Sequence, residues 1–150
     1  MLCNLQCEPG RLLVRMVRRC WHRVEMRRGR SLFINDGVYG NLAELKWIGP
    51  QFPARLIRPG QEPAAAPVPP STFTVRLRDS IDSMPGPHWL PEDVIEGDWV
   101  EIGMTGAYSN SLGTDFNGMG KSSVVFVDDG AWYNEVVPAT DENLQAVRVA

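Results

Sequence analysis

The chain has 150 residues, enough for one domain with a modest hydrophobic core. Hydrophobic residues make up 43% of it and the formal net charge is -3, so the composition is that of a globular protein without a strong field to attract nucleic acid or a membrane. No apolar run approaches the roughly 18 residues that cross a bilayer. The opening MLCNLQCEPG also lacks the basic and apolar regions of a secretory signal. We therefore expect a cytoplasmic protein.

Most predicted elements are short strands separated by glycine and proline turns. After one possible helical turn at 11–17, strands are predicted at 21–26, 31–35, 55–58, 73–77 and 98–103. A hairpin is predicted from strands at 124–127 and 132–136. The first strand alternates only loosely, with Trp21, Val24 and Met26 set against His22, Arg23 and Glu25.

The stretch 60–71 is rich in proline and alanine and predicts a surface loop rather than a core element. Many short strands with such connections argue for a mainly β fold, a β-sandwich or barrel. None of the signatures GxSxG, Walker loop, HExxH or GxGxxG occurs in the sequence. The segment 118–122 is only faintly like the end of a phosphate loop, because the upstream glycine spacing differs.

The cysteines could suggest a metal site and the arginines a nucleic-acid surface, and we consider both interpretations weak. Cys3, Cys7 and Cys20 are an odd, sparse set, so we expect reduced thiols. Cys3 and Cys7 with His22 do not have the spacing of a zinc knuckle and lack a fourth ligand, so we expect no metal site. Residues 11–30 carry eight arginines and one acid, which favours a solvated strand face or an acidic partner over a nucleic-acid patch.

Four segments, in this order and at these spacings, carry a family resemblance. They are CEPGR at 7–11, FINDGVYG at 33–40, RDSIDSMPGP at 78–87 with LPEDVIEGDWVEIG at 90–103, and GAYSNSLGTDFNG at 106–118. Together they resemble the C-terminal part of the fold type III pyridoxal-phosphate decarboxylases, which act on ornithine, lysine, arginine or diaminopimelate. The resemblance covers roughly residues 5–120 and is greatest to ornithine decarboxylase. It implies a remnant of the last strand of a (β/α)8 barrel at 1–17 and a C-terminal β-sandwich or barrel domain at 18–150.

The resemblance implies a binding site for pyridoxal phosphate. Glu8 matches the glutamate that pairs with the protonated ring nitrogen, which keeps the cofactor an effective electron sink. Gly10 and Arg11 would approach and pair with the phosphate. Tyr108 matches a tyrosine whose hydroxyl reaches the phosphate. The cofactor-binding residues implied are Glu8, Pro9, Gly10, Arg11 and Tyr108.

The resemblance also implies a substrate site shared between two subunits of a homodimer. Asp36 and Asp79 match the aspartates that bind the distal amine of a small amino-acid substrate, and Asp79 would reach into the neighbouring subunit's site. Asp82 matches an acid that pairs with a lysine of the partner, and Phe116 matches an aromatic residue near the interface. Diaminopimelate decarboxylases carry glutamate where Asp79 stands, so ornithine or lysine is the expected substrate.

Two departures from the family pattern concern catalysis directly. Arg78 stands where the family has the cysteine that donates a proton to the substrate carbon, and an arginine is a poor general acid. The Schiff-base lysine has no counterpart, since the two lysines, Lys46 and Lys121, fall in other contexts. Together with the unusual stretch 15–22, Arg78 suggests damaged coding in a fragment or pseudogene, or a misplaced start.

Two main functional hypotheses follow. The first is a fragment of an ornithine- or lysine-type decarboxylase of polyamine biosynthesis, inactive as an isolated chain. The second is a non-catalytic module that dimerises with a full-length decarboxylase. Neither involves nucleic acid or a membrane. A basic nucleic-acid-binding β-domain is a third and weaker reading.

Overall fold

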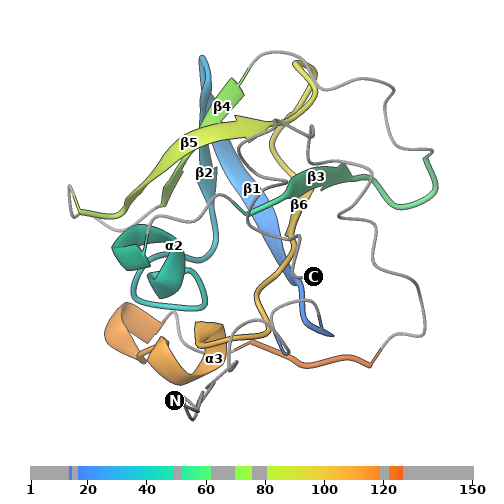
Figure 1. Ribbon diagram of the computed structural model, residues 1–150. Helices are drawn as coiled ribbons and strands as arrows, with labels where there is room; N and C mark the ends of the chain where they lie inside the picture. Colours follow the sequence, from blue (N-terminus) through green and yellow to red (C-terminus); the bar gives the residue numbers. More distant parts are fainter. Residues whose placement is uncertain are drawn as a thin grey trace, which may run out of the picture.

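The computed structural model describes residues 14, 17–48, 52–61, 70–75, 81–118 and 122–126. Strands dominate the described part, which confirms the prediction of a mainly β chain (Figure 1). The strands are β1 (Cys20–Arg28), β2 (Ser31–Ile34), β3 (Ala54–Ile57), β4 (Pro70–Val75), β5 (Ser83–Trp89) and β6 (Trp99–Ile102). The helical elements are α2 (Ala43–Ile48), α3 (Ser109–Leu112) and the 3-10 turn η2 (Phe116–Gly118).

The strands form one mixed six-stranded sheet in the order β3-β6-β1-β2-β4-β5. The long β1 lies in the middle and pairs antiparallel with β2 on one side and β6 on the other. β2 and β4 are parallel, while the β4–β5 and β3–β6 pairs are antiparallel. The edge strands β3 and β5 also contact each other, so the sheet curls towards itself.

The strand predicted at 21–26 is confirmed as part of β1, and the structure shows which of its side chains point inwards. Cys20, His22 and Val24 are buried, whereas Trp21 is 51% exposed. A register shift between Val24 and Met26 ends the regular alternation of buried and exposed side chains along β1. Buried apolar side chains from the sheet, from α2 and from the connecting loops form the core; they are Val24, Leu32, Ile34, Val38, Leu42, Leu45, Phe52, Ala54, Leu56, Met84, Leu90, Val94, Val100 and Ile102.

Four described elements were not predicted from the sequence: α2, β5, α3 and η2. The helix α2 follows the FINDGVYG segment, and β5 runs through Pro85 and Pro87. Proline lacks the N–H of a sheet ladder, but β5 is an edge strand that pairs only with β4, where proline is tolerated. β4 begins at Pro70, inside the stretch expected to be loop. Residues 122–126 are described without strand structure, and the rest of the predicted hairpin lies outside the described residues.

No helix among the described residues is long and apolar enough to cross a membrane. Several predicted positions lie outside the described residues: Cys3, Cys7, the cofactor segment Glu8, Pro9, Gly10 and Arg11, then Arg78, Asp79 and Lys121.

Candidate functional site beside Asp36

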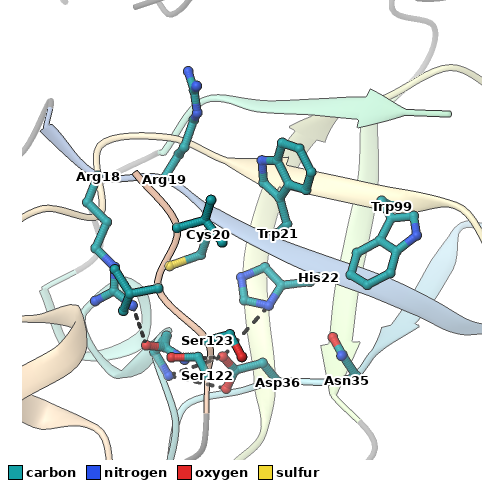
Figure 2. Close-up of a pocket in the computed structure, with 13 residues that line it drawn as sticks. Arg18, Arg19, Cys20, Trp21, His22, Asn35, Asp36, Trp99, Ser122 and Ser123 are labelled. Carbon is teal, nitrogen blue, oxygen red and sulfur yellow. Dashed lines mark hydrogen bonds and ion pairs between the residues drawn. The ribbon is translucent and has the colours of Figure 1, made fainter. Parts of the chain in front are cut away.

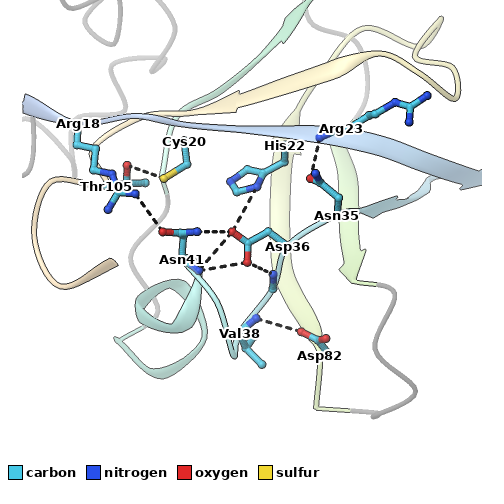
Figure 3. Close-up of polar contacts among 11 residues, drawn as sticks. Arg18, Cys20, His22, Arg23, Asn35, Asp36, Val38, Asn41, Asp82 and Thr105 are labelled. Atoms are coloured by element: carbon cyan, nitrogen blue, oxygen red, sulfur yellow. Dashed lines mark hydrogen bonds and ion pairs between the residues drawn. The ribbon is translucent and has the colours of Figure 1, made fainter. Parts of the chain in front are cut away.

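The turn after β2 holds the Asp36 carboxylate in a fixed position. Its Oδ1 accepts a hydrogen bond from the Gly37 backbone amide at 2.7 Å, and its Oδ2 accepts one from Asn41 Nδ2 at 2.7 Å (Figure 3). The Asn41 backbone amide donates to the same carboxylate at 3.2 Å. A Cβ at Gly40 would lie 1.9 Å from Asp36 Oδ1, so glycine is required for this close approach. Asp36 thus stabilises the turn and also belongs to the candidate site.

His22 projects from β1 towards this carboxylate. Its Nδ1 lies 3.7 Å from Asp36 Oδ2, and only 2% of the residue is exposed. Burial lowers the pKa of His22 to about 4, because desolvation outweighs the opposing effect of the Asp36 carboxylate; the Arg18 cation lowers it further. The imidazole is therefore neutral at pH 7.

Two further contacts complete the polar cluster. An Arg18 guanidinium nitrogen donates to Asn41 Oδ1 at 3.0 Å, so the Asn41 amide lies between the Arg18 cation and the Asp36 carboxylate. The Cys20 thiol donates to Thr105 Oγ1 at 3.3 Å. Burial raises the pKa of Cys20, so the thiol stays protonated at neutral pH.

These groups line a cavity of about 460 Å³ between β1, the end of β2 and the segment 122–125 (Figure 2). This volume is in the range of small-molecule sites. Its lining combines two tryptophans with charged and amide groups, and consists of Arg18, Arg19, Cys20, Trp21, His22, Asn35, Asp36, Asn41, Trp99, Ser122, Ser123, Val124 and Val125. Among the described residues, no group of three or more His, Cys, Asp or Glu is arranged to hold a metal ion.

The other predicted acid within the described part, Asp82, lies on the opposite side of the same turn. It is 1% exposed, and its Oδ1 accepts a hydrogen bond from the Val38 backbone amide at 3.1 Å. Figure 3 shows Asp36 and Asp82 contacting consecutive parts of one loop rather than each other. The two acids therefore stabilise the loop jointly, whatever further partners they meet.

The predicted aromatic residues lie on the segment around α3. Tyr108 precedes α3 with a left-handed backbone, φ 60°, and is 50% exposed. Such a conformation is costly for a residue with a side chain and is characteristic of functional positions. Phe116 is 51% exposed, and its ring packs against Tyr39 with 4.7 Å between centroids.

Of the cofactor-binding residues that the resemblance implies, only Tyr108 lies among the described residues. It is exposed, and its phenol hydroxyl is a hydrogen-bond donor of the kind that a phosphate oxygen accepts. Lys46 does not fit as the cofactor-binding lysine, because its Nζ donates to the Ser83 carbonyl oxygen at 2.9 Å near the surface.

Sequence reasoning missed the buried cluster around Asp36. It considered His22 only as a zinc ligand and gave Arg18 and Asn41 no role. One signal was available: Cys20, His22 and Val24 lie at a spacing of two, which places a histidine on the buried face once the face is known.

Known proteins resemble this chain at the level of sequence and fold. No family model matches it. It is 33% identical over 144 residues to diaminopimelate decarboxylase of Actinosynnema pretiosum subsp. auranticum, covering 94% of this chain and 32% of that protein. The chain thus spans about a third of the length of the curated relatives it matches.

Solved structures agree. The arginine decarboxylase of Paramecium bursaria Chlorella virus, bound to agmatine, superposes with a TM-score of 0.64 at 28% identity, over 75% of this chain and 31% of that one. Lysine/ornithine decarboxylase of Vibrio vulnificus, complexed with cadaverine, gives a TM-score of 0.61 at 24% identity, over 79% and 32%. With the polar turn and the sheet described above, these similarities show that the chain belongs to the fold type III pyridoxal-phosphate-dependent decarboxylase family.

Proposed function

We propose that the chain is the C-terminal part of a cytoplasmic, PLP-dependent decarboxylase that converts ornithine or lysine into a diamine for polyamine biosynthesis. Residues 18–150 would form its β-sandwich or barrel domain and residues 1–17 the end of its (β/α)8 barrel. The observation that carries this proposal is the Asp36 carboxylate, fixed by its own turn on the wall of a 460 Å³ cavity.

The substrate assignment rests on carboxylates. A carboxylate held in a largely buried position pairs well with an ammonium group. Asp36 would take the distal amine of the substrate, with Asp79 of a second subunit as its counterpart. A substrate with a distal carboxylate would instead be repelled by both acids, which disfavours diaminopimelate even though relatives that bear this name are similar to the chain.

Cofactor contacts are proposed for Tyr108 and, by resemblance, for Glu8, Pro9, Gly10 and Arg11. Tyr108 would donate its hydroxyl proton to a phosphate oxygen, and Arg11 would pair with the same group. When bound, pyridoxal phosphate serves as the sink for the electrons that CO2 leaves behind. Asp82 and Phe116 are proposed to lie near the homodimer interface of the intact enzyme.

We expect the isolated chain to be inactive. The cofactor-binding lysine has no counterpart in it, and Arg78 stays protonated where the family's proton donor stands. The test combines the purified chain with pyridoxal phosphate and 1-¹⁴C-labelled ornithine or lysine and measures CO2. Release above a cofactor-only control would overturn the expected inactivity.

The alternative function, a non-catalytic partner of a full-length decarboxylase, has its own supporting observation. Tyr108, Leu112 and Phe116 are 50%, 44% and 51% exposed on one short segment, which gives an apolar surface suited to another subunit. Its test is co-purification with a full-length homologue. Phe116→Ser should abolish the complex, whereas Ile95→Ser, at a 61% exposed position elsewhere, should leave it intact.

A further inference from the structure

His22 has a ring nitrogen that the fold buries without satisfying. No hydrogen-bond partner is present in the described structure for its Nε2, although the residue is 2% exposed and lines the cavity beside Asp36. A buried polar atom without a partner costs about 1–3 kcal/mol. His22 lines the cavity but its Nε2 atom is covered, so a partner that enters the cavity and displaces the covering side chains would satisfy this atom.

The surroundings of the ring determine what that partner must offer. His22 Nδ1 faces the Asp36 carboxylate at 3.7 Å, and this negative charge favours the neutral tautomer that carries its proton on Nδ1. Nε2 then carries a lone pair and accepts hydrogen bonds. Because burial keeps the pKa of His22 far below 7, this lone pair is present under physiological conditions.

We propose that His22 Nε2 is a second acceptor, beside Asp36, for a primary ammonium group bound in the cavity. The inference rests on the proposed function in assigning an ammonium group to Asp36, and it adds a specificity residue to that site. An ammonium carries three N–H donors on one nitrogen, so it can donate to a carboxylate oxygen and an imidazole nitrogen at once.

Other ligands fit the same wall less well. An anion would meet the Asp36 carboxylate and the His22 lone pair, both of which repel it. The described residues also provide no metal-ligand cluster. Two arginines line the cavity and would weaken the binding of a cation: Arg18, which donates to Asn41, and Arg19, whose charge is paired with the buried Glu101.

The test uses butylamine as probe and 1-butanol as its uncharged control, with the whole chain labelled with ¹⁵N. The chain has two histidines, and His88 lies on β5 outside the cavity lining, so it is an internal reference. Butylamine should shift the ¹⁵N resonance of His22 Nε2 upfield, as expected when an unprotonated nitrogen accepts a hydrogen bond. His88 should not move, and 1-butanol should shift neither.

Three variants separate the role of His22 from simple folding effects. His22→Leu removes the acceptor and should weaken butylamine binding about tenfold, the order expected for a hydrogen bond to a charged group. His22→Gln, which offers an amide oxygen at similar reach, should retain binding within about threefold. Arg18→Gln keeps a donor for Asn41 but removes the like charge, and should strengthen binding.

Each outcome decides one question. Unchanged binding in His22→Leu, with loss in Asp36→Asn, overturns the role of His22 and leaves Asp36 as the amine site. Absence of butylamine binding to the native chain overturns the inference altogether. Neither result bears on decarboxylation, because the probe has no carboxylate and the experiment contains no cofactor. Conversely, if this chain binds butylamine but releases no CO2 when it is joined to a decarboxylase barrel and loaded with cofactor, the proposed function alone is rejected.

Discussion

The Oδ1 atom of Asp82 accepts a hydrogen bond from the Val38 backbone amide, and this contact joins the start of β5 to the loop that positions Asp36. Asp36 is held from within that loop by Gly37 and Asn41, whereas Asp82 holds it from a segment 44 residues further along the chain. The geometry of the candidate site therefore depends on a long-range contact as well as on local turn chemistry.

Removing the Asp82 acceptor should loosen this loop. Asp82→Ala leaves the buried Val38 amide without its partner, and we expect a loss of about 1–3 kcal/mol in the free energy of unfolding. Asp82→Asn keeps a carbonyl oxygen and should lose less than half as much. Urea denaturation monitored by tryptophan fluorescence measures both. Equal stability of Asp82→Ala and the native chain would contradict a structural role for this contact.

Gly40→Ala should displace the Asp36 carboxylate, because the new Cβ would lie 1.9 Å from Oδ1. We expect a destabilisation of about 1–3 kcal/mol, as for other overpacked sites. The steric cause can be checked by repeating the substitution in an Asp36→Ala background, where the obstructing carboxylate is gone. There Gly40→Ala should cost much less, and purely additive effects in this double-mutant cycle would rule out the clash.

Acid should destabilise the chain through His22. The folded-state pKa of about 4 lies below the usual 6.5, so the unfolded chain takes up the proton first as the pH falls. The stabilising contribution is complete above pH 6.5 and is lost between pH 6.5 and 4, with a total of about 3 kcal/mol. His22→Leu has no such group, so the difference in unfolding free energy between it and the native chain should vary across this window. A difference independent of pH would contradict the neutral, buried imidazole.

Glu101 should be the most important charged residue for stability. It is fully buried on β6, pairs with Arg19 at 2.7 Å and with Arg55, and accepts a hydrogen bond from Trp21 Nε1 at 2.9 Å. Glu101→Gln should cost about 3–5 kcal/mol, as is typical when one member of a buried ion pair is removed.

Glu25→Gln is the matched control for that substitution. The Glu25 carboxylate lies 3.9 Å from the Arg23 guanidinium, and the two side chains are 26% and 51% exposed. The expected loss in the free energy of unfolding is therefore less than about 0.5 kcal/mol. Thermal unfolding measures the loss of stability in both variants. Similar losses for Glu101→Gln and Glu25→Gln would contradict a special contribution from the buried ion pair.

The strands were predictable because their signals are local. Alternating or β-branched stretches between glycine turns located β1, β2, β3, β4 and β6 to within a few residues. β5 was missed because SMPGPHW contains two prolines, and only its position at the sheet edge, a tertiary property, makes them acceptable. The six-residue helix α2 is too short for its period to be distinguished from a turn.

The site was only partly predictable, because some of its residues are brought together only by contacts between distant parts of the sequence. Asp36 could be identified from the FINDGVYG segment, since a motif and a turn coincide there. His22 could not, because its importance comes from a neighbour 14 residues away in sequence, which β1–β2 pairing brings within 3.7 Å. The Asn41 link to Arg18 spans 23 residues and likewise exists only in the folded chain.

The most direct test of the decarboxylase account is the rate of CO2 release by a chimera. This chain would replace the matching third of Vibrio vulnificus lysine/ornithine decarboxylase and would carry either Arg78 or Arg78→Cys. The account predicts that the cysteine version decarboxylates ornithine or lysine at least about a hundredfold faster than the arginine version, the usual effect of a general acid. Equal rates in two soluble, cofactor-loaded chimeras, or turnover of diaminopimelate alone, would contradict it.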